Sequence, residues 1–192
     1  PNAETVEPDT KLGLDDMFEL VRKADEDYRT LQEKKEKLKQ KIEEYRAKQQ
    51  IVAPFRPLEC DLHRVLHYRY ITYRFGRIAV EFYHKMQKYL MDDLKAIFVE
   101  GERDESYVYG VYFVSQAETQ KVDAVFRSLH FERIELKDEF EGTPDTAYRV
   151  LENEIARVNL EIEDLDKQAG EMLADRAPQL VAARDRLEEL SN

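Results

Sequence analysis

The sequence predicts an α+β protein, in which a four-stranded lobe is enclosed by the two halves of a long helical hairpin. Apolar residues recur at alternating steps of four and three in residues 15–50 and again in residues 144–192, which is the spacing of a coiled-coil seam. Between these two segments, strand-like and helix-like runs follow one another. Only six glycines and 37% charged residues indicate a helix-rich, extended chain rather than a disordered one.

Charge and composition exclude several classes of function. The 192 residues carry a formal net charge of −11, and no segment has the basic footprint that binding to nucleic acid requires. A lone cysteine, Cys60, excludes an internal disulfide framework and suits a reducing compartment. No apolar run approaches the length of about 18 residues that a membrane span needs.

The first helix is expected over residues 15–53. Residues 1–14, which contain Pro8 and Gly13, should form a flexible tail, and Pro54 and Pro57 should end the helix. A helix with so narrow an apolar stripe needs a partner helix. Its seam is interrupted once, by a lysine, and consists of Met17, Val21, Ala24, Tyr28, Leu31, Lys35, Leu38, Ile42 and Tyr45.

A globular lobe is expected over residues 54–143. After a short helix at Leu58–Leu66, the residue patterns predict the order strand, helix, strand, strand, helix, strand, which is the ferredoxin-like βαββαβ arrangement. Gly76 should mark a bulge or a close backbone approach in the first strand. The predicted strands are 68–78, 96–100, 107–114 and 131–136, with a turn at 101–105, and the helices are Val80–Leu94 and a segment capped by Ser115.

The returning helix is expected over residues 144–192, with Thr143 as its N-cap and Pro144 in its first turn. Pro178 predicts a kink near residues 170–178, where the apolar stripe shifts phase to Leu173. Its seam consists of Leu151, Ile155, Val158, Ile162, Leu165, Ala169 and Met172.

The two seams match each other in antiparallel order, with the lobe at the tip of the coiled coil. If Tyr45 faces Leu151, Ala24 faces Met172, and each pair between them is apolar except the one that contains Lys35. Apolar residues beyond this pairing, Leu180 and Leu187, could drive a non-physiological dimer of the isolated chain.

Candidate reactive residues are few. Cys60, His63 and His67 would share one face of a helix and could bind a soft metal, although a small buried thiol with two packing histidines explains the pattern as well. No nucleophile motif, phosphate-binding loop or metalloprotease signature occurs in the sequence. We therefore expect no catalytic residue, no cofactor and no small-molecule substrate.

Five segments follow one another between the two seams: Tyr70–Ile78 (Tyr-Ile-Thr-Tyr-Arg-Phe-Gly-Arg-Ile), Ala96–Gly101, Tyr107–Phe113, Leu129–Ile134 and Gly142–Pro144. In this order they resemble subunit I of bacterial V/A-type rotary ATPases, the counterpart of eukaryotic V-ATPase subunit a. The resemblance covers roughly residues 10–190, and Ala79 departs from it because the family often has a proline there.

The resemblance implies a distal lobe of the cytoplasmic arm with its two coiled-coil strands, within a membrane-embedded complex. Its role would be that of a non-catalytic stator segment, which links peripheral-stalk subunits of the E and G type to the membrane domain of subunit I and resists rotor torque. The complex would transport protons or sodium and would use or make ATP. Because the chain starts at Pro1, we expect a piece of a longer protein. The alternative is a freestanding coiled-coil adaptor or regulatory module with an effector-binding lobe.

Overall fold

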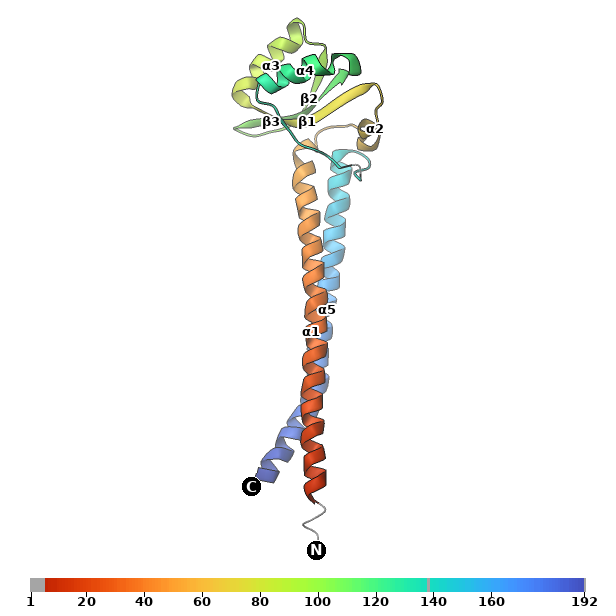
Figure 1. Ribbon diagram of the computed structural model, residues 1–192, viewed down its shortest axis with the longest axis vertical. Coiled ribbons are helices and arrows are strands. Elements are labelled where there is room, and N and C mark those ends of the chain that lie inside the picture. Colours follow the sequence, from red (N-terminus) through yellow and green to blue (C-terminus); the bar gives the residue numbers. More distant parts are fainter. Residues whose placement is uncertain (1–5, 138, 192) are drawn as a thin grey trace. The chain divides into compact units, whose positions relative to one another are not determined.

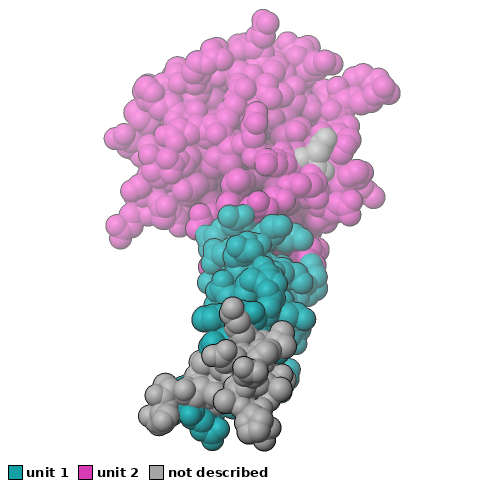
Figure 2. Space-filling view, turned by 60° about the horizontal axis from the view of Figure 1, so that its bottom comes forward, with its two compact units in different colours: residues 1–43, 156–192 teal, residues 44–155 magenta. Residues whose placement is uncertain are grey.

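The computed structural model describes residues 6–137 and 139–191 and contains two compact units. Unit 1 comprises residues 1–43 and 156–192, and unit 2 comprises residues 44–155 (Figure 2). Two long helices, α1 (Val6–Val52) and α5 (Pro144–Ser191), each contribute to both units. The described residues of unit 1 are therefore all helical, and unit 2 contains the sheet.

Helix α1 begins earlier than the sequence predicted, whereas α5 has the predicted extent over the described residues. Helix α1 begins at Val6, so part of the expected tail over residues 1–14 is helical, while residues 1–5 lie outside the described residues. Helix α5 is a single helix that includes Pro178. A kink in it near residues 170–178 stays a prediction. The side chains of Leu180 and Leu187 also lie outside the described residues.

Unit 2 contains a four-stranded antiparallel sheet with the strand order β2-β3-β1-β4. Helices α3 and α4 lie on one face of this sheet, and α2 lies on the opposite side (Figure 1). The elements, after a 3-10 turn at Ala53–Phe55, are α2 (Leu62–Leu66), β1 (Ile71–Ala79), α3 (Val80–Asp92), β2 (Ala96–Arg103), β3 (Tyr107–Ser115), α4 (Thr119–Ser128) and β4 (Glu132–Arg133).

The element order confirms the expected succession of strands and helices, with differences at several boundaries. Strand β1 begins at Ile71 rather than at residue 68, and α2 begins at Leu62 rather than at Leu58. Strand β2 runs on into the predicted turn at residues 101–105, and β4 holds two residues instead of the predicted six. Ser115 makes no capping hydrogen bond with its side chain, and a 3-10 turn at Gln116–Glu118 precedes α4. By contrast, the Thr146 backbone N–H donates to Thr143 Oγ1 at 3.1 Å, which confirms Thr143 as the cap of α5.

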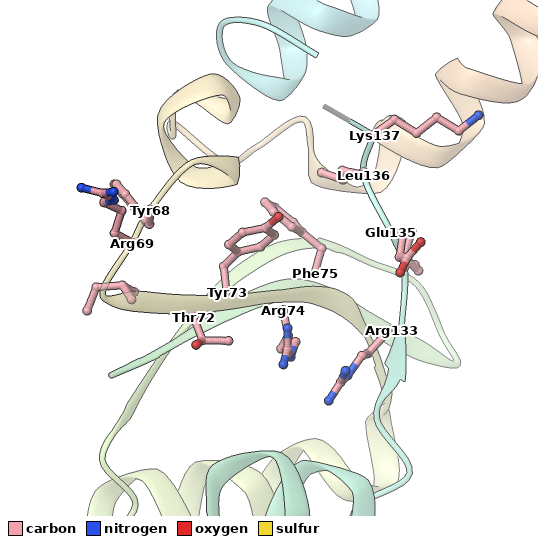
Figure 3. Close-up of a pocket in the computed structure, with 12 residues that line it drawn as sticks. Tyr68, Arg69, Thr72, Tyr73, Arg74, Phe75, Arg133, Glu135, Leu136 and Lys137 are labelled. Carbon is pink, nitrogen blue, oxygen red and sulfur yellow. The ribbon is translucent and has the colours of Figure 1, made fainter. Parts of the chain in front are cut away.

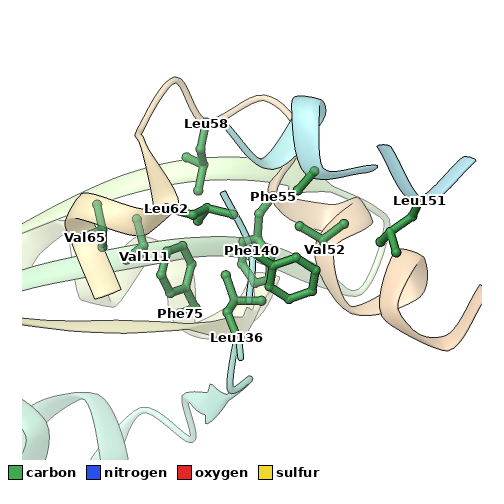
Figure 4. Packing of buried hydrophobic residues seen from close by; sticks show 11 residues of the cluster. Val52, Phe55, Leu58, Leu62, Val65, Phe75, Val111, Leu136, Phe140 and Leu151 are labelled. Carbon is green, nitrogen blue, oxygen red and sulfur yellow. The ribbon is translucent and has the colours of Figure 1, made fainter. Parts of the chain in front are cut away.

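Each face of the sheet is covered by its own hydrophobic cluster. On the face that carries α3 and α4, Ile78, Val108 and Phe126 are fully buried. The other face packs Phe75 and Val111 against the cluster that Figure 4 shows. Because Val52, Ala147 and Leu151 belong to that second cluster, unit 2 extends beyond the predicted limits of residues 54–143. The cluster also contains Phe55, Leu58, Leu62, Val65, Leu136 and Phe140.

Gly76 lies where two backbones come closest. A Cβ atom at this position would lie 2.2 Å from the Glu132 carbonyl oxygen and 2.5 Å from the Phe131 ring. The pairing of β1 with β4 is only two residues long and includes Gly76 itself, so the strands cannot separate here without losing most of that pairing. The close approach predicted from the sequence is confirmed.

We therefore predict that Gly76→Ala lowers the free energy of unfolding by about 1–3 kcal/mol, because the added methyl group overpacks the contact between β1 and β4. Gly170→Ala is the matched control: among the described residues, a Cβ atom added there would have no atom within 4 Å other than its chain neighbours and its own helix backbone. That control should be neutral or stabilising in the same urea titration, since alanine favours helix. Equal stability of the Gly76→Ala variant and the parent chain would contradict the close approach.

Candidate functional site

In unit 1, α1 and α5 lie side by side (Figure 1). Along each helix, the residues that are buried or half-buried form one stripe, and the residues outside it are mostly exposed. On α5 the stripe follows the predicted seam through Val158, Ile162, Leu165, Ala169 and Met172. It then continues to the half-buried Arg176, whereas Leu173 is 49% exposed. The predicted phase shift at Leu173 is therefore absent from the described part of this helix.

On α1, the stripe departs from the prediction in its first half. Val21 and Tyr28, two expected seam residues, are 48% and 41% exposed. The residues just before them, Leu20 and Asp27, are half-buried instead. The remaining predicted positions, Met17, Ala24, Leu31, Lys35, Leu38, Ile42 and Tyr45, are half-buried or buried.

Ion pairs of opposite polarity join the two helices within unit 1 at Lys35 and at Asp27. Lys35 Nζ on α1 lies 2.6 Å from Asp166 Oδ1 on α5, and the hydrogen bond and charge of Asp166 raise the pKa of Lys35. In the second pair the acid is on α1 and the base on α5, because Asp27 accepts a hydrogen bond from Arg176. From one pair to the other, the residue number rises on α5 as it falls on α1, so the helices are antiparallel.

In unit 2, Asp123 is the only buried charged residue among those whose burial the structure describes. Its side chain joins four elements of the fold. The Tyr112 hydroxyl of β3 donates to Asp123 Oδ1 at 2.6 Å. Two guanidinium groups, those of Arg74 on β1 and Arg133 on β4, lie 3.2 Å and 3.1 Å from Oδ2. One carboxylate of α4 thus ties the helix to three strands of the sheet.

The environment of Asp123 favours its charged form. Burial alone raises the pKa of its carboxyl group, but the hydrogen bonds from Tyr112 and Arg74, with the positive charges of Arg74 and Arg133, lower it further than burial raises it. Burial and the hydrogen bond to Asp123 raise the pKa of Tyr112, so the hydroxyl stays a donor at neutral pH.

Beside this network lies a groove of about 430 Å³ between β1 and the segment that follows β4. Figure 3 shows Arg74 and Arg133 pointing to the side of β1 opposite Tyr73 and Phe75. Other charged residues on its lining are Arg69, Glu135 and Lys137. The two guanidiniums are held by Asp123, and the lining has no cysteine, histidine or serine that could act as a nucleophile or base.

The candidate metal residues are not brought together as ligands. Cys60 is half-buried, and burial raises the pKa of its thiol, which disfavours the thiolate that binds metal. His67 Nδ1 lies 2.7 Å from the carbonyl oxygen of His63, with the two rings 4.5 Å apart. Over the described residues, no group of three or more His, Cys, Asp and Glu side chains could hold a metal ion.

No family model and no curated protein sequence matches the chain. Among solved structures, it is similar to the crystal structure of the cytoplasmic N-terminal domain of subunit I, homolog of subunit a, of V-ATPase, with a TM-score of 0.53 and 12% identity. The two proteins share a fold. The similarity covers 85% of this chain and 55% of that subunit I chain, so this chain matches about half of its length. No helix in the described part is long and apolar enough to cross a membrane.

Sequence reasoning missed the hydrogen-bond network of Asp123 and the ion pair between Asp27 and Arg176. The signal for Asp123 was present, since it lies next to the core residue Val122 and three residues before Phe126 on an amphipathic helix. The signal for Asp27 and Arg176 was weaker, because apolar neighbours at Tyr28 and Leu173 offered a more regular stripe.

We predict that Asp123→Asn lowers the free energy of unfolding by about 3 kcal/mol at pH 7, because two partly buried guanidiniums lose their counter-charge. The control is Glu132→Gln, whose carboxylate is 52% exposed and pairs with Arg77, and which should cost about 1 kcal/mol or less. Both are measured by urea unfolding.

Asp123→Asn and the parent chain also give a test at different pH values. The pKa of Asp123 is lower in the folded than in the unfolded chain, so its contribution is fully present above about pH 4, the unfolded value. That contribution is lost as the pH falls through the lower folded pKa. Stability should therefore fall less steeply below pH 4 in Asp123→Asn than in the parent chain, and parallel curves would contradict the network.

We also predict coupling between Asp27 and Arg176. Asp27→Arg and Arg176→Asp should each lower the melting temperature, because each places like charges together, and the double variant should recover most of the loss. The expected coupling free energy is about 1 kcal/mol. The control is the charge reversal Glu33→Arg. Glu33 is exposed and lies 4.0 Å from Arg29, so this variant should change the melting temperature little. Strictly additive losses would show that the pair does not form in solution.

Proposed function

We propose that the chain is a non-catalytic stator segment of a V/A-type rotary ATPase, equivalent to part of the cytoplasmic arm of subunit I. The observation that carries the proposal is the shared fold with the cytoplasmic N-terminal domain of subunit I over 85% of the chain. In this role the chain links peripheral-stalk subunits to a membrane domain that conducts protons or sodium, at the cytoplasmic face of the membrane.

The fold details that support this proposal are a ferredoxin-like lobe and an intramolecular coiled coil. The order β2-β3-β1-β4, with antiparallel pairs and with α3 and α4 on one face, is that expected for a βαββαβ lobe. The stripes of α1 and α5, with their two ion pairs, support the coiled coil.

The ion pairs also support the register in which Leu38 faces Val158. Side chains on a helix lean toward its N-terminus, so in an antiparallel pair each long side chain reaches toward lower residue numbers. In an antiparallel pair, the numbers of two residues whose backbones lie at the same level add up to a constant. When two side chains meet through their tips instead, the two residue numbers add up to several units more than that constant. Lys35 with Asp166, and Asp27 with Arg176, both show this offset.

The chemistry of the side chains agrees with a mechanical role. A stator must resist torque. This requires continuous helices, and domains whose helices and strands are held together by contacts among several elements. Helices α1 and α5 have 47 and 48 residues, and Asp123 ties four elements of unit 2 together. The groove beside Asp123 offers basic side chains that hold the fold rather than a reacting centre.

We predict that the chain binds a stalk heterodimer of E- and G-type subunits with a Kd of tens of micromolar or tighter, measured by titration calorimetry. The Asp123→Asn variant, if folded at the assay temperature, should bind as the parent does, since its carboxylate is buried. No heat of binding to the parent chain would contradict the stator role and would favour a freestanding adaptor.

A further inference from the structure

The face of the sheet opposite α3 and α4 is covered over one half only. Residues paired across antiparallel strands point to the same face, so Phe75, Val111 and Val99 form one cross-strand row. Phe75 and Val111 are 2% and 1% exposed beneath the cluster of Figure 4, but Val99, on the edge strand β2, is 40% exposed.

The next row, Tyr73, Phe113 and Ile97, is more open. Ile97 is 66% exposed, and Tyr73 and Phe113 are half-buried. Ile71, two residues before Tyr73 on the same face of β1, is 41% exposed. We name Ile71, Ile97, Val99 and Phe113 the open corner.

The open corner is a contiguous surface on three neighbouring strands. Adjacent strands are about 4.8 Å apart, so the corner spans roughly 10 Å across β1, β3 and β2. A hollow of about 400 Å³ beside it is lined by Ile71, Ile97 and Phe113 among other residues. Single exposed apolar residues are ordinary, but a joined group of them on one sheet face marks an interaction surface.

The packing of the same face indicates what covers the corner. Its buried half is covered by short helical segments, the turn at Ala53–Phe55 and α2, whose side chains contact Phe75 and Val111. The carbonyl oxygen of Pro54 would lie 2.6 Å from a Cβ atom at Gly101, so the helical cover reaches β2 at that end. A further helix beside these segments would complete the layer, whereas a strand added to the edge of β2 would leave Ile71 and Phe113 uncovered.

The charges around the corner indicate the polarity of that helix. Lys95 precedes β2, lines the hollow and has a side chain that is 77% exposed, with a long ion pair to Glu118 at 4.0 Å. Arg69, just before β1, is also exposed. Both cations are available to carboxylates on a docked helix.

We propose that the open corner docks an amphipathic α-helix of a partner, with an apolar stripe over Ile97 and Phe113 and carboxylates facing Lys95 and Arg69. The identity of the partner as a helical stalk subunit rests on the proposed function. The location of the site on the sheet does not.

The test compares three variants of the 192-residue chain in titrations with the E/G-type stalk heterodimer. Ile97→Asp removes the most exposed apolar residue of the corner and places a carboxylate toward the acidic helix, so Kd should rise about tenfold or more. Lys95→Glu should give a smaller loss that shrinks as salt is added. The matched control is Met91→Asp, since Met91 is 86% exposed on α3, on the other face of the sheet, and its Kd should not change.

Each outcome decides between the two proposals. Binding to the parent chain that Ile97→Asp leaves unchanged would overturn the open corner and leave the stator role standing. Absence of binding to the parent chain would overturn the stator role and, with it, the stalk subunit as the partner of the open corner. Sedimentation of the chain alone provides the last arm: a dimer that Ile97→Asp abolishes would show that a second copy covers the corner, which also overturns the partner helix.

Discussion

The structure depends on one constraint, that a narrow apolar stripe on a long helix must be buried against another helix. Neither α1 nor α5 has a stripe wide enough to form a core alone, and each meets the need of the other in unit 1. The last residues of α1 and the first of α5 enter the core of unit 2 through Val52, Ala147 and Leu151. The two helices therefore supply all the described residues of unit 1 and close the core of unit 2.

Within unit 2, the sheet is stabilised differently on its two faces. Against α3 and α4, apolar packing surrounds a charged centre at Asp123, whose two guanidinium partners come from strands that are neighbours in the sheet. On the other face the buried residues of the cluster are all apolar, with the ring centroids of Phe55 and Phe75 5.2 Å apart in edge-to-face contact. The first face thus has a buried carboxylate at its centre, while the second has an apolar centre and stays open at one corner.

Periodicity and turn chemistry were sufficient to predict the order of elements and the cap at Thr143, because each depends on residues near one another in sequence. The close approach at Gly76 was predicted from the glycine itself, although its neighbours, Phe131 and Glu132, are distant in sequence. Strand β4 was overestimated, since the run from Phe131 to Leu136 has strand chemistry but its ladder with β1 comprises Glu132 and Arg133. One further backbone hydrogen bond follows, from Ile134 N–H to the carbonyl oxygen of Phe75. The polar contacts of Asp27 and Asp123 depend on residues that are far away in sequence or on another element. No local pattern states which basic residue will meet an acid, so those parts of the candidate sites required the structure.

The charged residues that α1 contributes to its ion pairs with α5 have a consequence during synthesis of the chain. The residues of α1 are made before residues 53–143, and those of α5 follow only after them. In that interval the exposed stripe of one α1 could meet the stripe of another nascent chain. In a parallel, in-register pair, Asp27 would face Asp27 and Lys35 would face Lys35, and both contacts are repulsive. The residues that match α1 to α5 therefore also disfavour the parallel, in-register association of α1 with its own copies.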